Sequence, residues 1–180
     1  MSTMTVLPPP AARLVPPVPC CLPVTIRDTT GTEVLIREVR REDTPAIRDL
    51  HGRCSETTLR RRYFGISPQV DNLLSWVFDP EQGHCLAAFV DGRLVGLGHL
   101  MAPDWTGAAE IAVMVDDALQ GRHIGPSLVD LVLTLGRQLR YPGLHAEVTL
   151  DNGKMRQILV RRGFSSIPEA GAYTMSLSLD

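Results

Sequence analysis

Between residues 84 and 139 the hydrophobic positions of the chain change from a strand-like to a helical period. His84–Val90 and Arg93–Met101 are mainly apolar runs around Asp91-Gly92, a pair that suits the two-residue turn of a β-hairpin. Ala109–Val115 is apolar apart from one Glu and contains no Gly or Pro, which predicts a strand buried on both faces. After it, apolar residues recur at three- and four-residue steps, as one buried face of a helix requires. These residues are Leu128, Leu131, Val132, Leu135 and Leu139.

The segment before this unit predicts a hairpin and two helices. Val24–Arg27 and Glu33–Val39 flank a polar, Gly-containing connection, which is typical of paired strands. Asp43 and Thr44 then provide an expected helix cap, with Pro45 in the first turn and Ile47, Leu50 and His51 on one face. A second helix is expected to begin near Ser55, which supplies a simple N-cap.

The segment after the unit predicts a strand at 145–150, a helix over Asn152–Arg162 and a last strand at Ala172–Leu179. Strands and helices are therefore mixed along the chain. This order predicts the α/β (α+β) class, with a mostly antiparallel sheet flanked by helices.

The composition favours one globular domain. The chain has 180 residues, of which 44% are hydrophobic and 21% charged, and its formal net charge is −2. This balance gives no overall attraction to nucleic acid or to an anionic membrane, and no apolar stretch is long enough to span a bilayer. Neither partner is expected.

Residues 1–23 and the cysteines bear on domain boundaries and on location. The first 23 residues are rich in proline, with Arg13 as their only charge, which predicts a flexible tail before a domain at 24–180. A docking arm for a partner is the alternative. The four cysteines show no spacing typical of a metal site or a disulfide framework, so we expect no metal and a reducing, cytoplasmic location.

The loop that follows Ala109–Val115 has the composition of an anion-binding site. Unpaired N–H groups of the first helical turn lie beside Gly121, Gly125 and Arg122, and such groups bind phosphate. The sequence Gly125-Pro126-Ser127 does not match a P-loop, and the glycine spacing does not match a dinucleotide fingerprint.

This loop resembles the acyl-CoA pyrophosphate loop of the GCN5-related N-acetyltransferase (GNAT) family, usually Gln/Arg-x-x-Gly-x-Gly/Ala after a strand that ends in Val. Gln120, Gly125 and Val115 match it, and Asn152 and Gly163-Phe164 continue the likeness, which covers roughly residues 34 to 179. The resemblance implies a GNAT fold, with a twisted sheet of about six to seven strands and about four helices. It also implies an acetyltransferase that takes acetyl-CoA as its acyl donor.

The resemblance further implies which residues bind the donor. The pantetheine arm is expected to pair like an extra strand with β-strand residues at 113–115, the diphosphate to lie on the loop, and Asn152 to reach the arm from the far side. The cofactor-binding residues expected in this way are Val113, Met114, Val115, Gln120, Gly121, Arg122, His123, Ile124, Gly125 and Asn152.

Glu110 is the candidate catalytic residue. A lysine amine with a reference pKa near ~10.4 must lose its proton before it attacks a thioester, and Glu110 is the only acidic residue in its strand. The alternative is a carboxylate that simply faces solvent. The pattern Ala-Glu-Ile-Ala-Val resembles bacterial protein lysine acetyltransferases that modify acyl-CoA synthetases, which implies that Glu110 is a general base and a protein lysine the acceptor.

Residues 55–64 resemble a helix of the same subgroup and contain Arg60, Arg61 and Arg62. Three successive arginines are most simply a solvated helix face. Their functional alternative is contact with an acidic protein partner, because Arg forms bidentate pairs with carboxylates.

Three residues depart from the family pattern. His123 replaces the usual Gly, Pro126 removes an amide donor, and Leu159 stands where many relatives have a Tyr that protonates the leaving thiolate. Two other functions therefore stay open: an acetyltransferase for small-molecule amines, and a non-catalytic module that senses CoA or binds a protein. The sequence does not indicate the acyl chain length or the oligomeric state.

Overall fold

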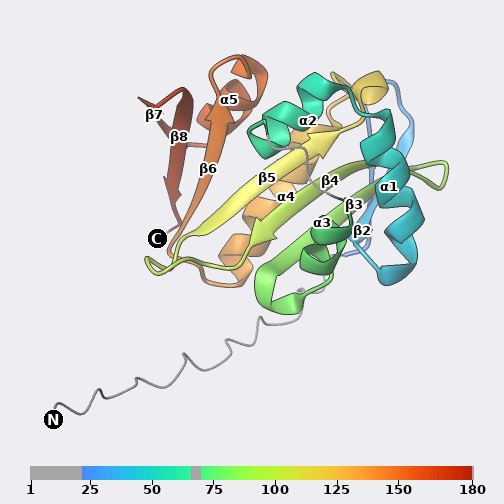
Figure 1. The fold of residues 1–180 in the computed structure, drawn as a ribbon, viewed down its shortest axis with the longest axis horizontal. Helices are drawn as coiled ribbons and strands as arrows, with labels where there is room; N and C mark the ends of the chain where they lie inside the picture. The colour runs from blue at the N-terminus through green and yellow to red at the C-terminus, as the bar shows by residue number, and fades with distance from the viewer. Residues whose placement is uncertain (1–21, 66–69, 180) are drawn as a thin grey trace, which may run out of the picture.

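The computed structural model describes residues 22–65 and 70–179. They form one eight-stranded sheet in the order β1-β2-β3-β4-β5-β6-β8-β7, shown in Figure 1. The strands are β1 (Val24–Arg27), β2 (Glu33–Glu38), β3 (Gly83–Val90), β4 (Arg93–Met101), β5 (Ala109–Val115), β6 (Gly143–Thr149), β7 (Ser165–Glu169) and β8 (Ala172–Ser178). The helices are α1 (Thr44–Arg53), α2 (Glu56–Tyr63), α3 (Val70–Val77), α4 (Ile124–Gln138) and α5 (Gly153–Val160).

The sheet is antiparallel except where β5 pairs with β6. This arrangement confirms the predicted mixed class and mostly antiparallel sheet, with eight strands in the described part instead of six to seven. The hairpin turn at Asp91-Gly92 is also confirmed, because both residues have positive φ (48° and 76°).

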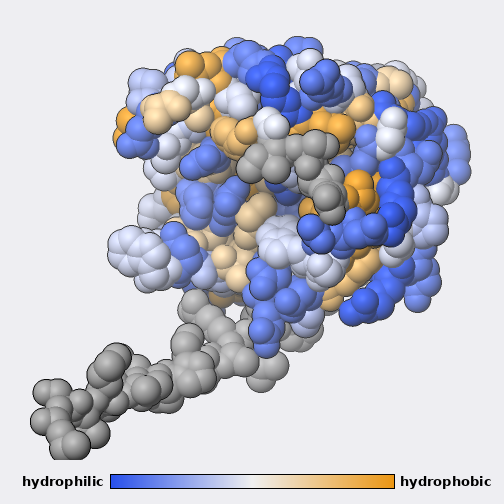
Figure 2. Space-filling model, viewed as in Figure 1, coloured by the Kyte–Doolittle hydropathy of each residue, from blue (hydrophilic) through white to orange (hydrophobic). Residues whose placement is uncertain are grey.

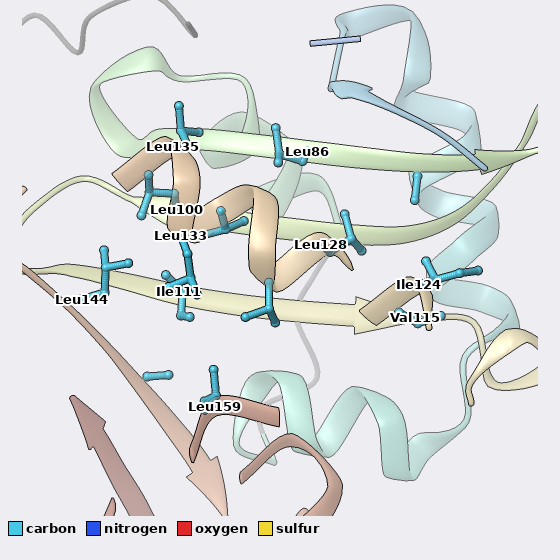
Figure 3. Packing of buried hydrophobic residues seen from close by; sticks show 14 of the residues in the cluster. Leu86, Leu100, Ile111, Val115, Ile124, Leu128, Leu133, Leu135, Leu144 and Leu159 are labelled. Atoms are coloured by element: carbon cyan, nitrogen blue, oxygen red, sulfur yellow. The ribbon is translucent and has the colours of Figure 1, made fainter. Parts of the chain in front are cut away.

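Helices cover both faces of the sheet. α4 packs on one face, where Leu128, Val132 and Leu135 are buried against strands β3 to β6, as Figure 3 shows for two of them. α1, α2 and α3 lie on the opposite face (Figure 1) and bury a second apolar cluster that includes Ile47 and Leu50. The helical face predicted after residue 128 is therefore confirmed.

β5 and β6 diverge, and this divergence positions the site. They pair only through Ala109–Leu144 and Glu110–His145, whereas β5 continues its pairing with β4 as far as Val115. Figure 1 shows the two strands separating toward the end where α2 and α5 lie. The edge of β5 beyond Glu110 is thus left without a β6 partner.

Two elements were not predicted. α3 has buried residues at Leu73, Leu74 and Val77, and it follows α2 where only two helices were expected. β7 is a short strand at the end of the sheet order that contains Pro168, a residue tolerated at an edge because it needs no ladder N–H.

Two predicted helix caps had different outcomes. The Thr58 N–H donates to Ser55 Oγ (3.2 Å), so the cap of α2 is confirmed. Asp43 is the N-cap residue of α1 and Pro45 lies in the first turn, as predicted, but the Asp43 side chain makes no capping hydrogen bond to the helix. Its carboxylate instead accepts from both terminal nitrogens of Arg37 (2.7 Å each), which is the stronger, charge-assisted pairing.

Other predictions concern boundaries and partners. The strand expected at 145–150 begins at Gly143, because it pairs with β8 from that residue onward. Residues 1–21 of the expected tail lie outside the described residues. In residues 22–65 and 70–179, no helix has both the length and the apolar character needed to cross a membrane.

Candidate active site

A cavity of about 170 Å³ lies where β5 and β6 separate. Its walls come from α2, β5, β6, the start of α4, and α5. Eight of the residues expected in the site line it: Glu110, Val113, Met114, Val115, Gln120, Gly121, Gly125 and Asn152. Arg122, His123 and Ile124 are not among the lining residues.

Glu110 lies at the last point of contact between β5 and β6, opposite His145. Side chains alternate along a strand, so Glu110 shares a face of β5 with Ala112 and with Met114, which packs in the cluster under α1 and α3. Glu110 is half-buried and lines the cavity. Its carboxylate therefore lies in the cavity wall on the side of the sheet that carries α2.

The loop between β5 and α4 leaves room for a ligand beside its backbone. Gly121 has φ +82°, and nothing lies within 4 Å of a Cβ built on it. The first amides of α4 lack helical acceptors because of their position in the helix. A phosphate group fits such a loop, since backbone N–H groups and an open approach are available together.

Gln120 supports this loop through the hydrogen bonds of its side chain. Its side-chain amide donates to the Val115 carbonyl (3.2 Å) and to Thr58 Oγ1 (3.1 Å). These bonds connect the loop to the end of β5 and to α2. Because the side chain is engaged in this way, Gln120 shapes the cavity wall as well as lining it.

Arg122 points to the β1–β2 turn. Its guanidinium forms an ion pair with Asp28 and donates to Thr30 Oγ1 (2.8 Å) and Thr32 Oγ1 (2.9 Å). Burial alone would raise the pKa of Asp28, but hydrogen bonds from Thr30, Thr32 and Arg122 lower it to about 2. The sequence analysis expected the Arg122 side chain at the phosphate site. In the structure, this side chain instead connects the loop to the β1–β2 turn.

The acidic turn after β5 has a role that the sequence did not indicate. Asp116 pairs with Arg53 (3.0 Å) at the end of α1. Asp117 accepts from the N–H of Ser55, its Oγ and Thr58 Oγ1, each at 2.8 Å. Asp117 therefore fixes the start of α2 to this turn. The sequence predicted only that Ser55 caps the helix.

The far wall of the cavity is formed by α5 and the residues before it. Asn152 is the N-cap of α5, and its Oδ1 accepts from the Met155 N–H (3.3 Å). Asp151 accepts from Arg60 (2.6 Å) and Arg61 (3.2 Å) of α2. Leu159 is buried and lines the cavity, with an apolar side chain that has no proton to donate.

Comparison with protein families agrees with this architecture. The family model described as the acetyltransferase (GNAT) family matches residues 44–164. Acetyltransferase Pat of Mycolicibacterium smegmatis is 28% identical over an alignment of 153 positions, which covers 78% of this chain and 44% of that protein. The chain thus spans less than half the length of this relative.

Solved structures share the fold. The GNAT domain of S. lividans PAT has a TM-score of 0.79 at 19% identity, over 89% of this chain and 98% of that one. Salmonella typhimurium yncA, solved with acetyl-CoA, has a TM-score of 0.69 at 19% identity, over 82% and 94%. Spermidine N-acetyltransferase from Vibrio cholerae, solved with CoA and spermine, has a TM-score of 0.66 at 15% identity, over 81% and 95%.

Proposed function

The chain belongs to the acetyltransferase (GNAT) family, and we propose that its domain at 24–180 transfers an acetyl or short acyl group from acyl-CoA to a protein lysine. The observation that carries this proposal is the position of Glu110 in the wall of the cavity, where β5 and β6 part. One side of this cavity offers an anion-binding loop and the other a carboxylate, which are the two groups that the transfer needs.

Residues on three elements are suited to hold the donor. The amides around Gly121 and Gly125 suit its diphosphate, and Arg122 acts indirectly by fixing the loop. The edge of β5 at 113–115, which β6 leaves free, suits an extended arm that carries amide groups. Asn152 lines the opposite wall. When bound, acyl-CoA supplies the activated acyl group.

Glu110 is assigned as the general base. A lysine amine is almost wholly protonated at neutral pH, and only its neutral form has a free electron pair with which to attack. Glu110 Oε accepts that proton before the N–C bond forms, and the thioester C–S bond then breaks, with the sulfur leaving as a thiolate. Leu159 has no proton to return, so no residue is assigned to protonate the leaving group.

The charges in the cavity favour a protein lysine over a polyamine acceptor. Arg61, Arg62 and Lys154 line the cavity together with Glu110 and Glu147. A polycation that entered there would meet these cations, whereas a single lysine side chain brings one charge toward Glu110. The likeness to Acetyltransferase Pat supports the same choice.

The base assignment is tested by Glu110→Gln. We expect turnover to fall by roughly 10²–10⁴, the usual effect of losing a general base, with acetyl-CoA affinity changed only a few-fold. The deficit should shrink at high pH, where more free amine is present. Glu56→Gln is the matched control, because Glu56 is exposed and outside the cavity. Equal turnover of Glu110→Gln and wild type at neutral pH contradicts the assignment.

The acceptor class is tested separately by incubating the protein and labelled acetyl-CoA with a lysate of its host. Label in protein bands supports a lysine acceptor, and label only in small molecules supports a small-amine acetyltransferase. Acetyl-CoA binding without transfer to either fraction supports the non-catalytic module.

A further inference from the structure

The three successive arginines of α2 have different partners. Arg60 and Arg61 both bind Asp151, and Arg61 also donates to its backbone carbonyl (3.0 Å). Arg62 forms no ion pair with a carboxylate in the described part of the chain, although it lines the same cavity as Glu110. Figure 2 shows hydrophilic and hydrophobic residues side by side on the surface around α2. The arginines are therefore not one solvated face, because two are paired and the third is left in the cavity wall.

Arg62 is held in place by neutral groups. One terminal nitrogen donates to His99 Nδ1 (3.3 Å), and the guanidinium carbon lies 4.7 Å from the centre of the Tyr63 ring. Because Arg has only donors, Nδ1 of His99 must be the acceptor and its proton must be on Nε2. Burial, with the charge of Arg62 adding to it, keeps the pKa of His99 well below its ordinary value. His99 therefore orients Arg62 without neutralising its charge.

Tyr63 is itself held in position by His51. His51 Nδ1 donates to the Ile47 carbonyl (2.7 Å), so its Nε2 accepts from the Tyr63 hydroxyl (2.7 Å). Burial raises the pKa of Tyr63 to about 12, which keeps the phenol neutral. The aromatic face beneath Arg62 is thus attached to α1, and the guanidinium has a defined orientation with most of its donors unused.

The position of Arg62 indicates which ligand it would meet. His99 pairs with Ala112 on β5, and Glu110 lies two residues earlier on the same face, about 7 Å along a strand. The diphosphate loop begins beyond Val115, about 10 Å along the strand in the other direction. The His99 side chain that orients Arg62 is therefore nearer, along β5, to Glu110 than to the expected phosphates.

The remaining N–H donors of Arg62 are not sealed in the interior, and because the residue lines the cavity, they are open to an acceptor on a bound ligand. We propose that Arg62 binds a carboxylate that the acceptor carries close to its reacting amino group, so that the acceptor lysine lies in an acidic segment. This proposal rests on the proposed function and specifies its acceptor: the lysine amine meets Glu110, while the neighbouring carboxylate forms a bidentate pair with Arg62.

The proposal is tested by binding, without turnover. Two short peptides contain an acetyl-lysine flanked on both sides by Asp or, in the matched peptide, by Asn, and each is titrated into the protein in the presence of CoA. We expect wild type to bind the Asp peptide about tenfold tighter, and Arg62→Gln to bind both equally. Arg62→Lys should keep part of the preference, since it keeps a point charge. Arg137→Gln, an exposed arginine of α4, is the control and should keep all of it.

Equal binding of the two peptides by wild type, or a preference that survives Arg62→Gln, overturns the proposal; failure of wild type to bind either peptide also counts against it. Because no acyl transfer is needed, these outcomes are distinct from failure of the proposed function, which the lysate experiment measures.

The positioning role of His99 has its own test. His99→Leu should lose the preference while remaining folded, and His99→Gln, whose amide oxygen accepts from Arg62, should restore part of it. A full preference in His99→Leu contradicts that role.

Discussion

Two strand–loop–helix units flank the cavity, and they are held by interactions of different kinds. In the β5–α4 unit, Asp116 and Asp117 bind the end of α1 and the start of α2, while Arg122 binds Asp28 of the first hairpin. The side chain of Asp28 is fully buried, and that of Asp116 is 5% exposed. Two of the carboxylates that fix this loop, those of Asp28 and Asp116, are therefore shielded from water, although Asp117 is exposed. Such shielding suits a site whose backbone amides must be preorganised.

In the β6–α5 unit, the corresponding loop depends on Asp151. Its partners Arg60 and Arg61 are 47% and 32% exposed, and Asp151 itself is 42% exposed. Hydrogen bonds from Thr149, Arg60 and Arg61 lower the pKa of Asp151, but an exposed pair of this kind contributes little and is screened by salt. The comparison indicates one fixed wall and one wall that yields more easily.

Removing an apolar contact in the β5–α4 unit should have the largest effect on the free energy of unfolding. Leu128 is fully buried between α4 and the sheet, and Leu128→Ala should lower the free energy of unfolding by about 2–5 kcal/mol. Val160→Ala on α5 removes a side chain that is 45% exposed and should change it by less than about 0.5 kcal/mol. Urea unfolding of both variants measures the difference. Similar losses contradict the comparison.

The buried pair should appear in the pH dependence of stability. The pKa of Asp28 is about 2 in the folded protein and near ~3.9 in an unfolded chain, so its contribution is present above pH 4 and is lost as pH falls toward 2. Asp28→Asn should flatten the stability profile over this window, with proton uptake on unfolding reduced by up to about one. Urea unfolding between pH 2.5 and 4.5 measures the slope. An unchanged slope means that Asp28 does not carry the coupling.

The exposed pair should give a smaller and salt-dependent effect. Asp151→Asn should lower Tm by at most about 3 °C at low ionic strength, and by less in 1 M salt. The same salt should leave the effect of Asp28→Asn largely intact, because that pair is buried. Thermal unfolding of both variants in low and high salt is the measurement. An Asp151 effect that does not change with salt removes the distinction between the two walls.

Features encoded in a local stretch of sequence were predicted, and features that depend on contacts between distant residues were not. Strand β5, its loop and α4 have a strong local pattern, and Glu110, Gln120 and Gly125 were expected in the site where they now line the cavity. The role of Glu110 as a base stays a prediction. By contrast, Arg122 meets Thr30 across 92 residues, and no local pattern contains that information.

Other features were missed for related reasons. Val70, Leu73, Leu74 and Val77 have helical spacing, so α3 had a signal that was available in the sequence. β7 had none, because it is a mostly exposed edge strand containing proline. Arg62 differs from Arg60 and Arg61 because its hydrogen-bond partner is His99, 37 residues away, and only the folded chain brings Arg62 and His99 together.

The smallest effect concerns His123, the residue that differs from the family pattern in the fixed loop. It has φ 70° and ψ 4°, a left-handed conformation that costs a side chain about 1–2 kcal/mol, and its side chain is exposed and outside the cavity lining. His123→Gly relieves this strain but gives the unfolded chain more freedom, worth about 0.4–1 kcal/mol in the opposite direction. We therefore expect a gain in stability of about 1 kcal/mol or less.

Acetyl-CoA affinity should stay within about twofold of wild type at both pH 5.5 and pH 8. If the imidazolium instead contacts the diphosphate, wild-type affinity should rise as pH falls through about 6.5, and His123→Gly should bind more weakly at pH 5.5. Titration of both proteins with acetyl-CoA at the two pH values decides between a residue that only completes the turn and one that binds the ligand.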